Sequence, residues 1–105
     1  MDKLIEEISK FNKERDWDQF HSPNNLAKSV LIEAAELLEH FQFDPQGDDL
    51  QGIKEEVADV MTYCLMICER YGFSPQEIIR EKMKKNAAKY PADKVRGDSR
   101  KYNEY

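Results

Sequence analysis

The sequence has 105 residues, enough for one domain with a single core but short for an enzyme that encloses its substrate without self-association. Hydrophobic residues make up 40% and charged residues 35%, with four Gly and four Pro, which favours a helical bundle and disfavours a disordered chain. The net charge of -5 argues against broad binding to a nucleic-acid polymer, although a nucleotide that arrives with its own metal ion stays possible.

The N-terminal half predicts a helix, a loop and a second helix. The first helix is expected over residues 2–15, with a buried apolar stripe at Leu4, Ile5, Ile8 and Phe11. Residues 16–21 break this pattern and place two aromatic rings and an imidazole in a loop. Ser22-Pro23 is a typical helix start, with the Ser as cap and the Pro in the first turn, so the second helix is expected over residues 23–43.

The C-terminal half predicts two more helices and a tail. The short connection 44–48 makes the second helix and the third, expected over residues 48–71, antiparallel neighbours. Gly72 ends the third helix, and Ser74-Pro75-Gln76-Glu77 starts a fourth over residues 75–89, with Ile78, Ile79 and Met83 buried. Periodicity is lost after Tyr90. The fold class is therefore all-α, a four-helix bundle with an irregular C-terminal tail, formed by residues 1–105 as one domain.

The location of the protein follows from what the sequence does not contain. No apolar run approaches the length of a membrane span, and Met1-Asp2-Lys3 alternates in charge. We therefore expect a cytoplasmic protein without a membrane partner. Cys64 and Cys68 stand four residues apart on the third helix, where we expect both to be core residues, since zinc would need more ligands nearby.

Two acidic phrases dominate the central helices. Glu33 and Glu36 stand three apart on the second helix, as do Glu56 and Asp59 on the third, so each pair projects from one helix face. Four carboxylates on two apolar, mutually packed helices repel one another unless a cation lies between them. Oxygen ligands without His or Cys favour Mg²⁺. The alternative is a set of solvated surface charges.

A basic face and several aromatic residues are the other candidates. Lys82, Asn86 and Lys89 line one face of the fourth helix and offer donors to an anion; the alternative is a solvated, Lys-rich helix end. Aromatic rings in the 16–21 loop, with Phe43 and Tyr63, can stack on a base, although each ring taken alone is better explained as a core residue. His21 and His40 lack the Glu-x-x-His phrases of a di-iron bundle.

The chain resembles the MazG-type, all-α nucleoside triphosphate pyrophosphohydrolases, and within them the dCTP pyrophosphatase branch. The residues that carry the resemblance are Glu33-x-x-Glu36, Glu56-x-x-Asp59, the segment Glu14-Arg15-Asp16-Trp17-Asp18-Gln19-Phe20-His21, Phe41-Gln42, Lys82-Met83, Asn86, Tyr90-Pro91, Gly97 and Lys101-Tyr102. The similarity covers nearly the whole chain. Two positions depart from that branch: Phe43 stands where the branch tends to have Trp, and Ile8 stands where its first helix carries a base-holding His.

The resemblance implies a MazG-like bundle that binds Mg²⁺ through Glu33, Glu36, Glu56 and Asp59. It also implies base contacts from Trp17, Asp18, Gln19, Phe20, His21 and Tyr63, with Phe43 as a stacking ring, and phosphate contacts from Lys82, Asn86 and Lys89. We expect Tyr90 and Arg96 to contact the substrate as well. Glu36 and Glu33 are the expected catalytic acids. The implied assembly is a homotetramer, a dimer of dimers.

The expected activity is cleavage of a (d)NTP between the α- and β-phosphates, which gives the monophosphate and pyrophosphate. dCTP or a related dNTP is the expected substrate, with the base and sugar preference left open. Two alternatives stay open as well. One is a broad house-cleaning hydrolase of non-standard nucleotides, and the other is a metal-stabilised helical module that binds without turnover.

Overall fold

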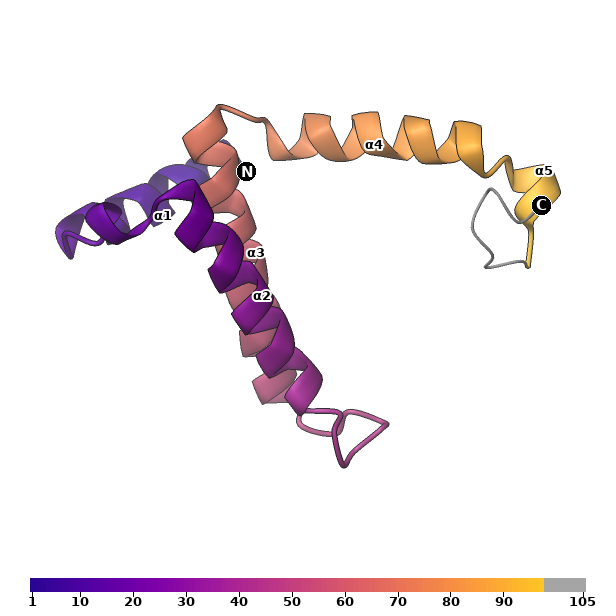
Figure 1. Cartoon of the computed structure of the whole chain (residues 1–105), viewed down its shortest axis with the longest axis horizontal. Helices are drawn as coiled ribbons and strands as arrows, with labels where there is room; N and C mark the ends of the chain where they lie inside the picture. The colour runs from indigo at the N-terminus through magenta and orange to yellow at the C-terminus, as the bar shows by residue number, and fades with distance from the viewer. Residues whose placement is uncertain (98–105) are drawn as a thin grey trace. The chain divides into compact units, whose positions relative to one another are not determined.

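The computed structural model describes residues 1–97, and all regular secondary structure in this range is helical (Figure 1). The elements are α1 (Asp2–Glu14), the short 3-10 helix η1 (Asp18–Phe20), α2 (Pro23–Glu39), α3 (Leu50–Tyr71), α4 (Pro75–Lys89) and α5 (Ala92–Val95). The predicted all-α fold with four main helices is confirmed, and the tail adds the single turn α5. The chain forms two compact units, Met1–Phe73 and Ser74–Tyr105, each described here by itself.

The antiparallel pair α2 and α3 is the centre of the first unit, where the two helices lie side by side (Figure 1). Leu26 of α2 is fully buried, and Leu65, Met66 and Cys68 of α3 complete the buried apolar core. Helix α1 packs against α3. Its buried Asn12 donates from Nδ2 to the Met66 sulfur at 3.7 Å. The two acidic phrases therefore lie on the two helices that share the largest interface.

Local capping chemistry sets most of the helix ends as predicted. Ser22 Oγ accepts from the Asn25 amide at 3.2 Å at the start of α2. Ser74 Oγ accepts from the Glu77 amide at 3.4 Å at the start of α4. Gly72 ends α3 with a φ of 70°, a left-handed conformation that glycine adopts without steric cost.

The connection between α2 and α3 is longer than predicted. Helix α2 ends at Glu39 and not at residue 43, because the amides of His40, Phe41 and Gln42 each bond the carbonyl three residues earlier. Such bonds tighten the last turn and close the helix. Helix α3 begins at Leu50, since Asp49 acts as its cap and accepts from the Gly52 amide at 3.0 Å. His40 and Asp49 consequently face each other across the connection.

Several side chains predicted to be buried are exposed. Leu4 and Phe11 of α1 are each nearly half exposed, because their side of α1 borders a cavity. Ile79 and Met83 of α4 are exposed as well, so helical periodicity alone did not predict burial there. Of the two free cysteines, Cys68 is buried and Cys64 is exposed, so the predicted core position holds for Cys68 alone. Burial raises the pKa of the Cys68 thiol, with a further contribution from Cys64.

Each helix within residues 1–97 is too short or too polar to cross a bilayer.

Candidate active site

Three carboxylates from the α2–α3 pair converge on one point. Oxygen atoms of Glu33, Glu56 and Asp59 all lie within 4.8 Å of one another. One oxygen of Glu33 and one of Glu56, the Oε2 atom in each case, are buried without a hydrogen-bond partner. Buried carboxylate oxygens in this state are costly, because burial removes hydration that nothing in the protein replaces.

Glu36 borders this cluster through Glu33. Burial of the Glu33 carboxyl is the largest cause of its raised pKa. Hydrogen bonding to Glu36 and repulsion from it raise the pKa further, as do repulsion from Asp59 and hydrogen bonding to Glu56. Together they raise the pKa of the Glu33 carboxyl from 4.5 to about 7. The four predicted acids are thus electrostatically connected, although the group with mutually close oxygens contains three of them.

The donor set fits a hard divalent cation. All three converging groups are carboxylates, the ligand type that Mg²⁺, Mn²⁺ and Ca²⁺ take, and no Cys belongs to the group. A cation at this point would satisfy the two buried oxygens and remove the repulsion that raises the Glu33 pKa. Glu33, Glu56 and Asp59 are therefore the residues that can hold a divalent metal ion, with Glu36 beside them.

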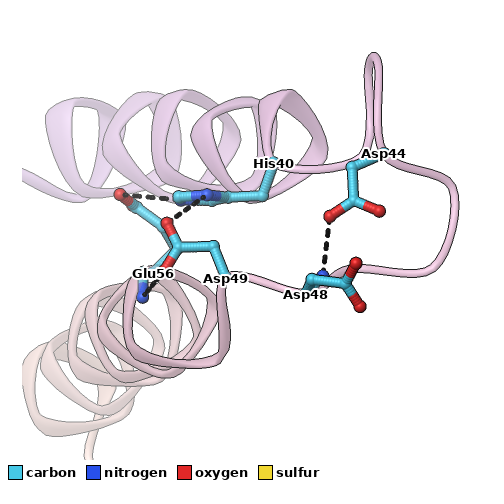
Figure 2. Close-up of polar contacts among 6 residues, drawn as sticks. His40, Asp44, Asp48, Asp49 and Glu56 are labelled. Carbon is cyan, nitrogen blue, oxygen red and sulfur yellow. Dashed lines mark hydrogen bonds and ion pairs between the residues drawn. The ribbon is translucent and has the colours of Figure 1, made fainter.

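His40 contacts the cluster from the end of α2. Figure 2 shows its ring between the carboxylates of Asp49, the N-cap of α3, and Glu56 of α3, with Nδ1 3.5 Å from Asp49 Oδ2 and Nε2 3.8 Å from Glu56 Oε1. In the same view, Asp44 Oδ2 accepts from the Asp48 amide at 2.7 Å and so shapes the connection. The ring lies within ion-pair distance of Glu56 Oε1, whereas the oxygen without a partner is Glu56 Oε2.

A cavity of ≈ 450 Å³ adjoins the acidic cluster within the first unit. The residues around it are Leu4, Glu7, Ile8, Phe11, Asn12, Trp17, His21, Asp59, Thr62, Tyr63 and Met66. Its volume is typical of a site for a small organic ligand, and most of its wall is apolar or aromatic. Asp59 belongs to both the cluster and the cavity wall, so a ligand in the cavity reaches the carboxylates.

Aromatic side chains flank the cavity in fixed positions. The Trp17 ring meets the Phe11 ring edge-on at a centroid distance of 5.8 Å, and the Arg15 guanidinium covers Phe11 at 3.6 Å. His21 and Tyr63 meet edge-on at 6.5 Å. Burial raises the Tyr63 pKa, as do Glu33, Asp59 and Glu36, so the phenol stays protonated and available as a donor.

The predicted base-contact residues separate into two groups. Trp17, His21 and Tyr63 line the cavity. Asp18, Gln19 and Phe20 form η1 beside it; Gln19 donates to Asp16, and Phe20 is exposed. Phe43 lies in the connection after α2 and is 92% exposed. Direct contacts to a base stay predictions for all seven residues, including the three that line the cavity.

The predicted phosphate-contact residues all lie in the second unit. Lys82, Asn86 and Lys89 are exposed on α4, Tyr90 caps its C-terminus, and Arg96 follows α5. The spacing along α4 is as predicted, and their role toward a substrate in the first unit stays a prediction. Lys101 and Tyr102, which contributed to the resemblance, lie outside the described residues.

Sequence reasoning missed several residues around the site. His40 stands four residues after Glu36, and Thr62 and Met66 stand three and seven after Asp59, so helical spacing already placed each on an acidic face. Ile8 was noted as a departure from a family pattern but not as part of a cavity wall. Ser29, whose side chain opposes the rise in the Tyr63 pKa, had no signal in the sequence.

Comparisons with known proteins point to one family. A family model described as MazG-like matches residues 28–105. Among curated proteins, the chain is 34% identical to human dCTP pyrophosphatase 1 and 32% identical to the mouse protein of that name, each alignment covering 91% of this chain. The chain spans 62% of the length of these relatives. A solved pyrophosphatase structure from Archaeoglobus fulgidus is 38% identical, with a TM-score of 0.80 over 87% of this chain and 92% of that one.

Proposed function

Because the chain belongs to the MazG-like family, we propose that it is a Mg²⁺-dependent nucleoside triphosphate pyrophosphohydrolase. The reaction cleaves a (d)NTP between the α- and β-phosphates and yields the monophosphate and pyrophosphate. One observation carries the proposal: Asp59 belongs both to a group of three converging carboxylates and to the wall of a cavity with aromatic sides. Through Asp59, the proposed metal site adjoins a cavity that can hold the base of a nucleotide.

The substrate is proposed to be a dNTP, with dCTP or a related nucleotide as the first choice. The names of the curated relatives support this choice. The cavity supports it in a general way, because Trp17, His21 and Tyr63 offer flat rings and a phenol donor to a base. Ile8 adds an apolar side chain to the same wall, so a base held there gains no hydrogen bond from this position.

The chemistry needs a positioned water and relief of negative charge. Bound Mg²⁺ would supply that charge relief on the phosphates when held by Glu33, Glu56 and Asp59 with Glu36 beside them. Glu36 orients the attacking water and accepts its proton while the new oxygen–phosphorus bond forms at the α-phosphorus. The bond from that phosphorus to the bridging oxygen breaks, and pyrophosphate leaves. Lys82, Lys89 and Arg96 are proposed to hold the leaving group, with Asn86 and Tyr90 as further contacts.

The proposed assembly is a homotetramer, a dimer of dimers, in the cytoplasm. Exposed apolar side chains on both central helices support self-association, because a single chain leaves them in water. Leu31 and Leu38 of α2 are 72% and 69% exposed, and Leu50 of α3 is 75% exposed. No nucleic-acid polymer or membrane is proposed as a partner.

Release of pyrophosphate tests the proposed function directly. The assay covers the four dNTPs, the matching NTPs and several modified nucleotides, each with and without Mg²⁺. We expect pyrophosphate release only when Mg²⁺ is present. The rate should fall at least about a hundredfold in Glu36→Gln, which is the usual contribution of a general base. Glu39→Gln, an exposed acid at the end of the same helix, is the matched control and should retain wild-type activity.

Two outcomes distinguish the alternatives. A non-catalytic helical module would release no pyrophosphate, and Glu36→Gln would reduce only the Mg²⁺-dependent rise in Tm. A house-cleaning hydrolase would prefer modified nucleotides over all four standard dNTPs. Wild-type protein without turnover on any nucleotide of the panel would contradict the proposed function.

A further inference from the structure

His40 lies beside the acidic cluster, and the proposed chemistry does not use it. His40 closes α2 and is 23% exposed at its side chain, with a carboxylate opposite each ring nitrogen. Asp49, opposite Nδ1, is itself fixed as the cap of α3, because its Oδ1 accepts from the Gly52 amide at 3.0 Å. Figure 2 shows Asp49, His40 and Glu56 in a row, with the His40 ring between the two carboxylates.

Glu56 is the member of the acidic cluster that this chain of contacts reaches. Its Oε1 lies 3.8 Å from His40 Nε2, whereas its Oε2 is buried without a hydrogen-bond partner. A glutamate has three side-chain torsions, so a contact at one oxygen limits where the other oxygen can lie. With Oε1 beside His40, the remaining oxygen is the one available to a cation shared with Glu33 and Asp59.

Gly52 leaves the space that the His40 imidazole occupies, because glycine has no side chain. A Cβ atom at position 52 would lie 2.5 Å from His40 Cε1 and 2.5 Å from Asp49 Oδ2. Such separations are far below van der Waals contact, so any side chain at position 52 displaces the ring or the cap. Gly52 is helical and its φ is not in the left-handed region, which means that the backbone itself does not require glycine here.

We infer that His40 is a positioning residue, which holds the Glu56 carboxylate in the orientation that a divalent cation requires. The inference rests on the proposed function in that the cation is the one the reaction uses. Outer contacts of this kind usually contribute about 10- to 100-fold to metal affinity. His40 contacts no substrate atom in this account and acts only through Glu56.

Calorimetric titration of the full-length protein with Mn²⁺ tests the inference without relying on turnover. We expect His40→Leu to bind Mn²⁺ about tenfold more weakly than wild type. His40→Gln should restore most of the affinity, because its amide nitrogen reaches about as far from the backbone as Nε2. His40→Asn reaches only as far as Nδ1 and should behave like His40→Leu.

Gly52→Ala provides an independent test with the imidazole still present. We expect this variant to fold, since the displaced atoms belong to side chains, and to lose Mn²⁺ affinity as His40→Leu does. Gln51→Ala at the neighbouring position, an exposed residue that bonds Glu55, is the matched control and should bind like wild type. Thermal unfolding of each variant shows whether the helices remain intact.

The outcomes separate this inference from the proposed function. Equal or tighter Mn²⁺ binding by His40→Leu, equal affinities of His40→Gln and His40→Asn, or a wild-type protein that binds no Mn²⁺ would each overturn the role of His40. Wild-type protein that binds Mn²⁺ but releases no pyrophosphate would contradict the proposed function. The Mn²⁺ affinities of the His40 variants would still test whether His40 positions Glu56.

Discussion

In the α2–α3 pair, some carboxylate oxygens are buried whereas several leucine side chains are exposed to water. On one side, oxygens of Glu33 and Glu56 are buried without partners, where hydration is lost. On the other, Leu31, Leu38 and Leu50 are largely exposed to water. A stable helix pair in water normally does the reverse, with apolar groups inside and charges outside.

The contrast indicates that the single chain is incomplete in two respects. The partnerless carboxylate oxygens favour a positive charge beside them, and the exposed leucines favour an apolar surface. We propose that a divalent cation supplies the first and further copies of the chain supply the second. Substitutions on each side can test this proposal.

Charged substitutions on the apolar side should disrupt self-association. Burial of one leucine contributes about 1.5–3 kcal/mol, so the double variant Leu31→Lys/Leu38→Lys should lower the assembled mass measured by size-exclusion chromatography with light scattering. The control Asn24→Lys/Gln42→Lys adds the same charge at exposed polar positions of the same region and should retain the wild-type mass. A wild-type protein that is monomeric at tens of micromolar would contradict the account of this side.

Removal of an aromatic ring from the cavity should weaken substrate binding. Base stacking contributes about 1–3 kcal/mol, so Tyr63→Ala should raise KM for the best dNTP by roughly 5- to 150-fold with a smaller change in kcat. Tyr71→Ala is the control, since Tyr71 is an exposed tyrosine on the same helix that stacks on Phe73. An equal rise of KM in both variants would show that the cavity does not hold the base.

The pH dependence of stability should report on Glu33. Its pKa is raised from 4.5 to about 7 in the folded protein, so between these values the folded state binds more protons than the unfolded state. The free energy of unfolding should therefore fall as pH rises from about 5 to 7, by on the order of 1 kcal/mol after allowance for solvent screening.

Urea unfolding in EDTA at pH 5 and pH 8 measures this effect. Glu33→Gln should lose the pH-dependent decrease and be the more stable protein at pH 8. Glu55→Gln, a neighbouring acid of α3 that bonds Gln51, should retain the wild-type slope. Parallel pH profiles for wild type and Glu33→Gln would show that the carboxylates do not repel one another as the geometry implies.

Features encoded by a few adjacent residues could be predicted from the sequence. The starts of α2 and α4 follow from Ser-Pro caps, and the end of α3 follows from Gly72, because each depends on local hydrogen bonds and φ preferences. The acidic faces were also predictable, since spacing of three residues fixes a common side of a helix.

Features that depend on what lies opposite a helix could not be predicted. Periodicity placed Leu4 and Phe11 on one stripe of α1 but could not show that a cavity lies beside it. The same pattern placed Met83 on an apolar face of α4 that stays exposed. The contact from His40 to Glu56 depends on where α2 stops, and tightened backbone bonds there have no clear signature in residue types.

The central claim is that the converging carboxylates of α2 and α3 hold a divalent cation. Anomalous diffraction from crystals grown with Mn²⁺ tests it most directly. We predict an anomalous peak within coordination distance of Glu33, Glu56 and Asp59, with the Glu56 carboxylate still beside His40. Crystals without a peak there, in which these three side chains turn toward bulk solvent, would contradict the account.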